Sequence, residues 1–266
     1  DDAINALIEG GMDKSQATLK GIEQFAPECA ILKVVGSECL DFVVDEGVQI
    51  HGGMGFSAET RIERSYRDAR INRIFEGTNE INRMLTVGMI MKKAMKGELD
   101  LMGPAMKVAG DLMSIPDIIE PSDTPLGNEE HMVDGFKKAI LMVAGSAVQK
   151  LMQSLAKEQE VLMNIADMAI WTYLAESVYL RVQKKINSQG EAACEHDIAI
   201  AKTYFYDVAD KIAKSAKDAI NSYAEGDEAR MMLMGLKRFT KTQPFNPKAA
   251  RQTIAQKLIE DGQYKF

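Results

Sequence analysis

The pattern of apolar and polar positions along this chain is helical throughout. Apolar residues recur at spacings of three, four and seven, as on one face of a helix, and no Asn-Gly turn lies between alternating segments. One such stripe consists of Leu162, Ile165, Ala169, Tyr173 and Leu180. We therefore predict an all-α protein.

Residues 3–26 are expected to form two helical pieces divided at Gly10-Gly11, and two longer helices are expected to follow in the first third of the chain. Pro27 suits the first turn of a helix that runs to about Gly47, with Ile31, Val35 and Phe42 as its apolar stripe. Thr78 is a plausible N-cap for a second helix, which runs from Asn79 to about Lys96 and ends at Gly97. The buried candidates of this second helix are Ile81, Leu85, Met89 and Ala94.

The segment from 97 to 128 differs from its surroundings because glycines and prolines interrupt it repeatedly. We predict a linker here, with at most a short helix near Ala105–Met113. Residues 1–96 then form one helical domain, and residues 129–266 form a second helical bundle with short loops. Its helices are expected at about 129–156, 157–187, 191–224 and 227–236, and residues 248–259 are expected to form a final short helix or a tail.

Composition narrows the class of protein. A hydrophobic content of 46% supports a packed core, and a net charge of −7 argues against nucleic-acid binding. No uninterrupted apolar run reaches the roughly 18 residues that span a membrane. The three cysteines are too sparse for a disulfide framework or a zinc site, so we expect a reducing, cytoplasmic compartment and no metal. The chain begins at Asp1 within a helical pattern and without an initiator Met, so we expect a piece of a longer protein.

Three stretches carry candidate chemistry. Three glycines in four residues, at 52, 53 and 55, allow either a turn between helices or the close approach of a ligand. The charged residues between 59 and 73 fit a solvated helix with pairs such as Glu63 and Arg67, or a brace for a neighbouring loop. Glu76, between an apolar residue and a glycine, is either a surface acid or a base.

Two of these stretches together resemble the acyl-CoA dehydrogenases. The segment Gln49-Ile50-His51-Gly52-Gly53-Met54-Gly55-Phe56 is similar to that family's QxxGGxGF block. A second block, RDxRxxxIxEGTNEI, is matched by Arg67-Asp68-Ala69-Arg70 and by Ile74-Phe75-Glu76-Gly77-Thr78-Asn79-Glu80-Ile81 at family spacing. The resemblance covers about residues 1–96, whereas the later region looks like the extra helical domain of the very-long-chain type.

The resemblance implies roles for individual residues. Glu76 would be the base that removes the α-proton of an acyl-CoA thioester, while the β-hydrogen leaves as hydride to flavin N5 and a trans-2-enoyl-CoA forms. A carboxylate beside Phe75 in an apolar, water-poor cavity is expected to have a raised pKa and to be a stronger base. Gly77 would lie at the substrate edge. Thr78, Asn79 and Glu80 would lie along the FAD. The FAD of a neighbouring subunit would be contacted by Gln49, Ile50, His51, Gly52 and Gly53, although His51 also fits as a spacer.

The same resemblance implies partners and leaves alternatives open. An electron-transferring flavoprotein would accept the electrons of fatty-acid β-oxidation, and the enzyme would be a homodimer or a higher oligomer. The family's N-terminal helical domain and middle β domain do not precede residue 1, so we expect this chain alone to be inactive. An acyl-CoA oxidase is one alternative. A helical module for dimerisation or peripheral membrane contact is another, supported only by short basic pairs such as Lys137-Lys138.

Overall fold

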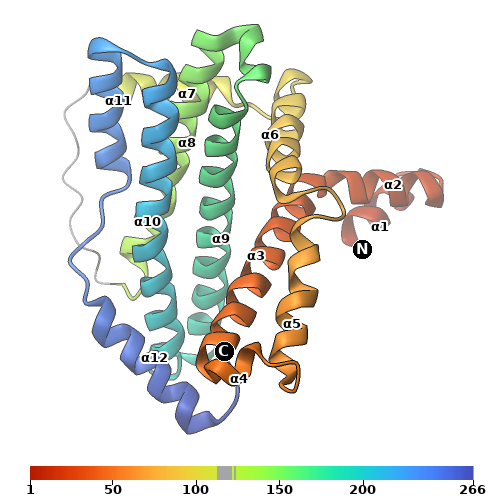
Figure 1. The fold of residues 1–266 in the computed structure, drawn as a ribbon. Helices are drawn as coiled ribbons and strands as arrows, with labels where there is room; N and C mark the ends of the chain where they lie inside the picture. The colour runs from red at the N-terminus through yellow and green to blue at the C-terminus, as the bar shows by residue number, and fades with distance from the viewer. Residues whose placement is uncertain (113–121, 123, 266) are drawn as a thin grey trace. The chain divides into compact units, whose positions relative to one another are not determined.

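The computed structural model describes residues 1–112, 122 and 124–265. Within those residues the ordered elements are α-helices and short 3-10 helices, and no β-strand occurs there (Figure 1). The prediction of an all-α protein is confirmed. The chain divides by its contacts into two compact units, Asp1–Leu99 and Asp100–Phe266, and each is described by itself.

The first unit is arranged around one long helix, α3. Helices α5 and α6 both pack along α3, and α4 adjoins its carboxyl end (Figure 1). The elements of this unit are α1 (Asp2–Glu9), α2 (Lys14–Gln24), α3 (Ala26–His51), α4 (Gly53–Phe56), α5 (Arg61–Arg70), the 3-10 helix η1 (Ile71–Arg73) and α6 (Asn79–Met95).

Helix α3 has the start expected from the sequence but a different buried face. Pro27 lies in its first turn, and the helix continues one turn beyond the predicted Gly47, to His51. Ile31 is buried as predicted, whereas the prediction for Phe42 is wrong because its side chain is 65% exposed. The buried stripe instead passes through Val34, Ser37 and Val44. The face of α3 that packs against α5 and α6 is therefore not the face that carries the predicted apolar stripe.

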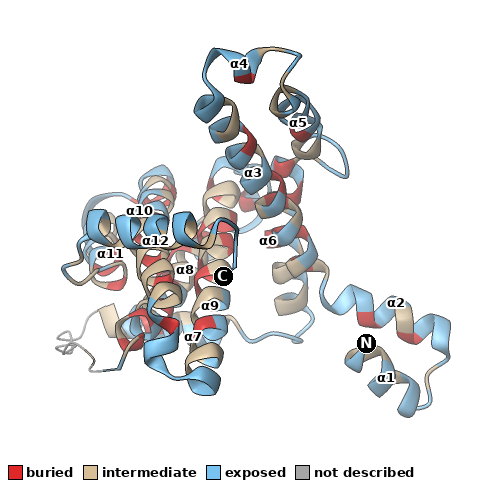
Figure 2. Cartoon of the chain, turned by 90° about the horizontal axis from the view of Figure 1, so that it is seen from below, coloured by how far each residue is buried: buried red, intermediate tan, exposed pale blue. Residues whose placement is uncertain are grey.

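Helix α6 has one buried face, shown in red in Figure 2, and most of the residues on that face are polar. Ile81 is 59% exposed and Leu85 is 49% exposed, so the prediction that they belong to the core is wrong. The buried positions of α6 are Asn79, Asn82, Arg83, Thr86 and Val87. Burial of this polar face requires hydrogen-bond partners for each group, and α3 provides several of them.

The second unit is a bundle in which α8, α9 and α10 run antiparallel to their neighbours in sequence (Figure 1). Phe136 on α8 and Phe205 on α10 are fully buried, with ring centroids 6.3 Å apart. The elements are α7 (Met102–Leu112), α8 (Gly127–Leu151), η2 (Met152–Lys157), α9 (Gln159–Gln189), η3 (Glu191–Cys194), α10 (Glu195–Tyr223), α11 (Gly226–Phe239) and α12 (Pro247–Asp261).

Helix α9 lies between two other helices of the bundle. Helix α9 packs against both α8 and α10, so its buried positions spread beyond the single predicted stripe. Ile165 is buried, but Leu180 at the end of that stripe is 56% exposed.

Among the described residues, only the segment Gly127–Lys157 is long and apolar enough to cross a membrane by length and composition. Several of its apolar side chains, including Val143, are buried in the bundle instead.

The predicted linker lies partly within the second unit. Helix α7 packs on α8 and contains the short helix expected near Ala105–Met113, as far as Leu112. Residues 113–121 and 123 of the predicted linker lie outside the described residues. The division of contacts falls between Leu99 and Asp100, inside the predicted 97–128 segment.

Glu129, in the first turn of α8, is expected to make the second unit less stable as pH rises. The residue is 7% exposed, and Oε2 has no hydrogen-bond partner among the described residues. Burial raises the pKa of its carboxyl despite a backbone hydrogen bond and nearby Lys202. A raised pKa in the folded state means that stability is greatest below the ordinary glutamate pKa and falls as pH passes the raised value. Glu129→Gln removes this dependence.

The measurement is urea unfolding at pH 4 and at pH 8, followed by helix content. Glu129→Gln is expected to raise the unfolding midpoint at pH 8 more than at pH 4. Glu195→Gln provides the control, since Glu195 occupies the first turn of α10 and is exposed. Equal shifts at both pH values in Glu129→Gln would show that this carboxyl is not the titrating group.

Candidate functional site

The candidate site is the turn that joins η1 to α6. Glu76 has a φ angle of +57° and Gly77 has a φ angle of +75°, so two successive residues adopt left-handed backbone conformations. Glycine adopts that region freely, but a residue with a Cβ atom is disfavoured there by about 1–2 kcal/mol. The surrounding structure must therefore hold Glu76 in this conformation.

Asn82 provides the first part of that support. Its side-chain Nδ2 donates to the backbone carbonyls of three successive residues: Glu76 at 3.2 Å, Gly77 at 2.8 Å and Thr78 at 3.1 Å. Asn82 is buried, so no water competes freely for this amide. A Cβ atom on Gly77 would lie 3.0 Å from Asn82 Nδ2, which adds a steric reason for glycine at this position.

Helix α3 provides the second part through Lys33. Its Nζ donates to the carbonyl of Gly77 at 2.6 Å and to Asn79 Oδ1 at 2.8 Å. Asn79 is 2% exposed, and its Nδ2 donates to Ser37 Oγ at 2.9 Å and to Glu38 Oε1 at 3.2 Å. The side chain of Asn79 therefore fixes α6 against α3 and is not available to a ligand.

A bidentate ion pair between Arg83 and Glu38 also joins α6 to α3. Arg83 donates from Nη1 to Glu38 Oε1 at 2.7 Å and from Nη2 to Glu38 Oε2 at 3.1 Å.

We expect Glu38→Ala to lower the free energy of unfolding of the first unit by about 2 kcal/mol, because the buried guanidinium loses its carboxylate. Chemical denaturation would measure this loss, and Glu59→Ala, at an exposed position, provides the control. A loss equal to that of the control would contradict the assignment.

The N–H groups of the turn face the other way from its carbonyls. In a trans peptide the C=O and N–H bonds point in opposite directions. Since the carbonyls of residues 76–78 converge on Asn82, the N–H groups of Gly77, Thr78 and Asn79 point outward. Within the described chain these three groups and the N–H of Glu76 donate no hydrogen bond. They lie at the start of the 17-residue helix α6, where the helix dipole favours negative charge.

Thr78 and Glu80 close the first turn of α6. Thr78 is the N-cap, as predicted, and its Oγ1 accepts a hydrogen bond from the Ile81 N–H at 3.2 Å. A hydrogen bond from its own backbone N–H, and another from Thr78, hold the pKa of the Glu80 carboxyl below its ordinary value.

The Glu76 side chain itself is exposed, and apolar side chains surround the turn. Phe75 and Ile74 are about half exposed, as is Ile81 on the first turn of α6. The apolar, water-poor cavity expected around Glu76 is therefore not formed by the first unit alone.

The glycine block occupies the carboxyl end of α3. Gln49 and Ile50 are exposed in the last turn, and His51 Nδ1 is bonded to the Gly47 carbonyl at 2.8 Å. Gly52 has a φ angle of +59°, and it and Gly53 face open space. The site residues of this block lie together as one exposed surface: Gln49, Ile50, His51, Gly52 and Gly53.

The first unit does not bring the glycine block to the Glu76 turn. Ser37 contacts Asn79, whereas Gln49 lies twelve residues further along the same helix α3 (Figure 1). At 1.5 Å per residue this separation is about 18 Å. The predicted residues therefore form two surfaces on α3, one near its middle and one at its carboxyl end.

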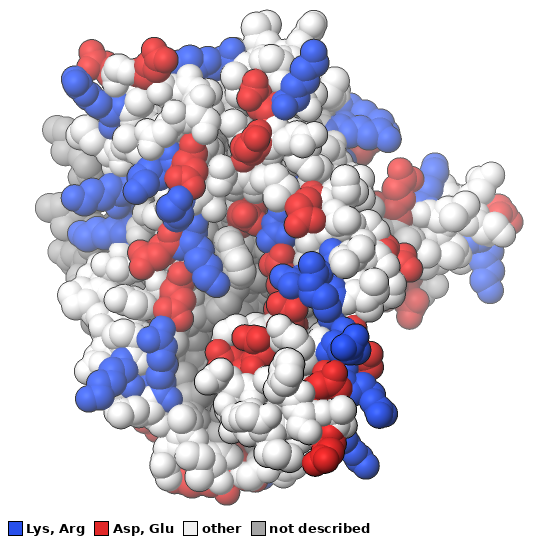
Figure 3. All heavy atoms as spheres, in the orientation of Figure 1, with Lys and Arg blue, Asp and Glu red and all other residues white. Residues whose placement is uncertain are grey.

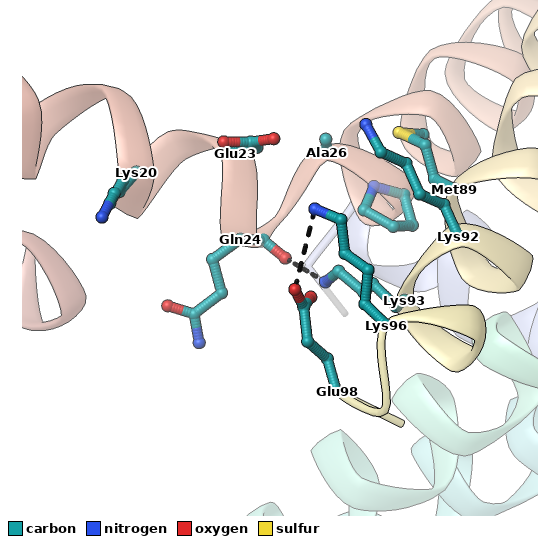
Figure 4. Close-up of a pocket in the computed structure, with 10 residues that line it drawn as sticks. Lys20, Glu23, Gln24, Ala26, Met89, Lys92, Lys93, Lys96 and Glu98 are labelled. Carbon is teal, nitrogen blue, oxygen red and sulfur yellow. Dashed lines mark hydrogen bonds and ion pairs between the residues drawn. The ribbon is translucent and has the colours of Figure 1, made fainter. Parts of the chain in front are cut away.

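A pocket of about 530 Å³ lies between α2, the start of α3 and the end of α6, away from the predicted residues (Figure 4). Lys93 Nζ donates to the Gln24 carbonyl at 2.9 Å, and Lys96 lies 3.8 Å from Glu98. Lysines in the last turn of a helix offset the negative end of its dipole. Lys93 and Lys96 therefore have structural partners within the first unit, and these contacts do not require a ligand in the pocket.

Charges elsewhere are mixed. On the face shown in Figure 3, acidic and basic side chains alternate. On α5 the predicted pair of Glu63 and Arg67 is present at 3.4 Å, and Arg73 pairs with Asp41 at 3.2 Å. Across the part of the chain that the structure describes, no group of three or more His, Cys, Asp or Glu side chains is placed to hold a metal ion.

Sequence reasoning missed Lys33, Ser37 and Asn82. The available signal was the placement of polar residues on the inward face of α6, at spacings of three and four: Asn79, Asn82, Arg83 and Thr86. A buried polar stripe needs a polar partner surface, and Lys33, Ser37 and Glu38 offer one on α3 at a similar spacing.

Two family profiles, both described as "Acyl-CoA dehydrogenase, C-terminal domain", match this chain. One matches residues 7–91 and the other matches residues 135–238. The first lies within the unit that carries Glu76, and the second lies within the helical bundle of the other unit.

Individual proteins show the same similarity. A probable acyl-CoA dehydrogenase of Bacillus subtilis (strain 168) is 42% identical over 99% of this chain and 44% of its own length. The very long-chain specific acyl-CoA dehydrogenase, mitochondrial, of Homo sapiens is 30% identical over 79% of this chain and 34% of its length. The crystal structure of an acyl-CoA dehydrogenase complexed with FAD from Bacillus anthracis has a TM-score of 0.93 and 41% identity. It covers all of this chain and 46% of that one. This chain therefore spans less than half the length of these relatives.

Proposed function

Because this chain belongs to the acyl-CoA dehydrogenase family, we propose that it supplies the catalytic base of an FAD-dependent enzyme that converts acyl-CoA thioesters to trans-2-enoyl-CoA. The observation that carries this proposal is the Glu76 turn. An exposed carboxylate is held in a left-handed conformation beside outward-facing N–H groups and apolar side chains. Strained backbone of this kind is maintained most often at functional sites.

The residues present fit contact with FAD. Its phosphates carry negative charge, and the start of α6 offers outward N–H groups from Gly77, Thr78 and Asn79. At the other surface, Gly52 and Gly53 have no side chain and face open space, so a ligand can approach the backbone closely. When bound, FAD supplies an acceptor for the hydrogen that leaves the substrate's β-carbon as hydride.

The chemistry assigned to this chain is proton removal. A Glu76 carboxylate oxygen takes the α-proton of the thioester, the α-carbon electron pair becomes the new C=C bond, and the β-hydrogen departs with its bonding electrons. The N–H of Glu76, which donates no hydrogen bond within the described chain, is suited to bind a carbonyl oxygen that gains negative charge. Exposed Phe75 and Ile81 provide apolar surface for excluding water once the remaining walls are present.

We propose further that the complete site uses two copies of the chain. The support is the separation of about 18 Å along α3 between the Glu76 turn and the glycine block. Gln49 to Gly53 of one copy would then contact the FAD that faces Glu76 of the other. Size measurement of the FAD-loaded enzyme tests this, and a monomer with full activity would exclude it.

The electron acceptor and the location of the enzyme are also proposals. An electron-transferring flavoprotein in fatty-acid β-oxidation fits the family, and the sparse cysteines fit a cytoplasmic enzyme. Assays with that acceptor and with oxygen separate the dehydrogenase from an acyl-CoA oxidase. Reduction of the flavoprotein without hydrogen peroxide supports the dehydrogenase, whereas peroxide formed at the rate of substrate consumption identifies an oxidase.

The 266-residue chain by itself is expected to hold little FAD and to show no acyl-CoA-dependent dye reduction. Both candidate surfaces are exposed, so neither encloses a ligand as cofactor pockets do. Flavin absorbance of the purified chain and a dye-reduction assay give the answer. Stoichiometric FAD with turnover would show that the site is complete within this chain.

A further inference from the structure

Asn82 and Lys33 do more than fill the interface between α3 and α6. Between them they donate to every carbonyl of the turn from Glu76 to Thr78. Neither side chain is directed at the exposed face where a substrate would lie, because both approach the turn from its carbonyl side. Their effect on a reaction would therefore pass through Glu76.

The geometry of the turn explains why such support is needed. Glu76 occupies a φ of +57°, which its side chain disfavours, and the carbonyls of Glu76 and Gly77 lie outside the helical hydrogen bonding of η1 and α6, which begins in α6 with the Thr78 carbonyl. No backbone N–H of the described chain donates to the carbonyls of Glu76 and Gly77. Without Asn82 and Lys33 those two carbonyls would lose their protein partners, and the turn could relax to a right-handed or extended conformation.

Relaxation would move the carboxylate and the N–H groups together. A change of φ at residue 76 rotates its side chain relative to α6, and it also turns the outward N–H groups that are opposite the captured carbonyls. Proton transfer requires the acceptor oxygen to lie within hydrogen-bond reach of the proton, and a displacement of about 1 Å can cost about 100-fold in rate.

We propose that Asn82, assisted by Lys33, is a positioning residue that holds the Glu76 turn in its reactive conformation. The inference rests on the proposed function, since it takes Glu76 as the base. It assigns to Asn82 a contribution to the rate of proton removal and not to the binding of the acyl-CoA.

The test compares variants of the FAD-loaded enzyme that contains this chain. Asn82→Leu keeps a similar volume but removes the donor, and it is expected to lower kcat by about tenfold to 100-fold with KM changed by less than about threefold. Asn72→Leu is the matched control, because Asn72 Nδ2 also donates to two carbonyls, those of Asp68 and Ala69, outside the turn. It is expected to leave kcat within about twofold.

A second readout does not depend on turnover. In a crystal structure of the Asn82→Leu chain, residue 76 is expected to have left the left-handed region, whereas it stays there in Asn72→Leu. A folded, FAD-loaded Asn82→Leu enzyme with unchanged kcat overturns the proposal. If Asn82→Leu does not fold, Lys33→Met serves in its place, with a kcat loss expected and an unchanged kcat decisive against the proposal.

Glu76→Gln in the same enzyme separates the two levels of inference. If Glu76→Gln retains turnover, the proposed function of Glu76 fails. If Glu76→Gln is inactive while Asn82→Leu has the kcat of the unmodified enzyme, only the positioning role of Asn82 fails.

Discussion

Glu76→Gln is expected to lower kcat for acyl-CoA dehydrogenation by about 10³-fold or more, with KM changed by less than about tenfold. Glutamine has nearly the same shape as glutamate, but its amide cannot accept the α-proton as a carboxylate does. Steady-state dye reduction by the FAD-loaded enzyme measures the effect. The substitution preserves the side-chain length at an exposed position, so folding and FAD content are expected to be unchanged.

Glu59→Gln is the control for this prediction. Glu59 is exposed and lies in the loop before α5, away from the Glu76 turn. Its replacement removes the same charge from the same unit and is expected to leave kcat unchanged. A similar loss in both variants would assign the effect to net charge and not to the base.

Phe136→Ala is expected to lower the free energy of unfolding of the second unit by about 4 kcal/mol. Phe136 is fully buried on α8 and packs against the ring of Phe205 on α10, so truncation leaves a cavity where two helices meet. Chemical denaturation of the 266-residue chain gives the measurement. Leu180→Ala, at a position 56% exposed on α9, is expected to cost less than about 1 kcal/mol. Equal losses in the two variants would contradict the assigned core.

Helix positions could be predicted from the sequence because local signals mark their ends. Pro27, Thr78 and Gly97 lie where a first turn, an N-cap and a helix end were expected. These residues act through their own backbone angles or through neighbours three residues away. Such short-range effects can be read from one sequence.

The buried face of each helix was harder to predict because it depends on which neighbouring helix packs against it. Ile81 and Leu85 were expected in the core, yet α6 turns its polar stripe toward α3. Burial of this polar stripe is stable because Lys33, Ser37 and Glu38 of α3 lie opposite it and form hydrogen bonds with its side chains. Apolar periodicity carries no information about that match between two helices forty residues apart.

The candidate site was predicted as a set of residues but not as an arrangement. Glu76, Gly77 and Thr78 could be singled out by resemblance, while the left-handed φ of Glu76 and the hydrogen bond from Asn82 to its carbonyl are visible only in the folded chain. The same is true of Asn79, whose side chain is buried between the helices. Roles of these residues toward substrate and FAD stay predictions that the proposed variants test.

Isotope exchange tests the role of Glu76 as the base most directly. An acyl-CoA analogue with sulfur at the β-position has no β-hydrogen, so only removal and return of the α-proton can occur. The FAD-loaded enzyme is incubated with this analogue in D2O, and deuterium at the α-carbon is followed by mass spectrometry. We predict incorporation by the unmodified enzyme and at least about 10³-fold slower incorporation by Glu76→Gln. Exchange by Glu76→Gln at the unmodified rate would contradict the assignment of Glu76 as the base.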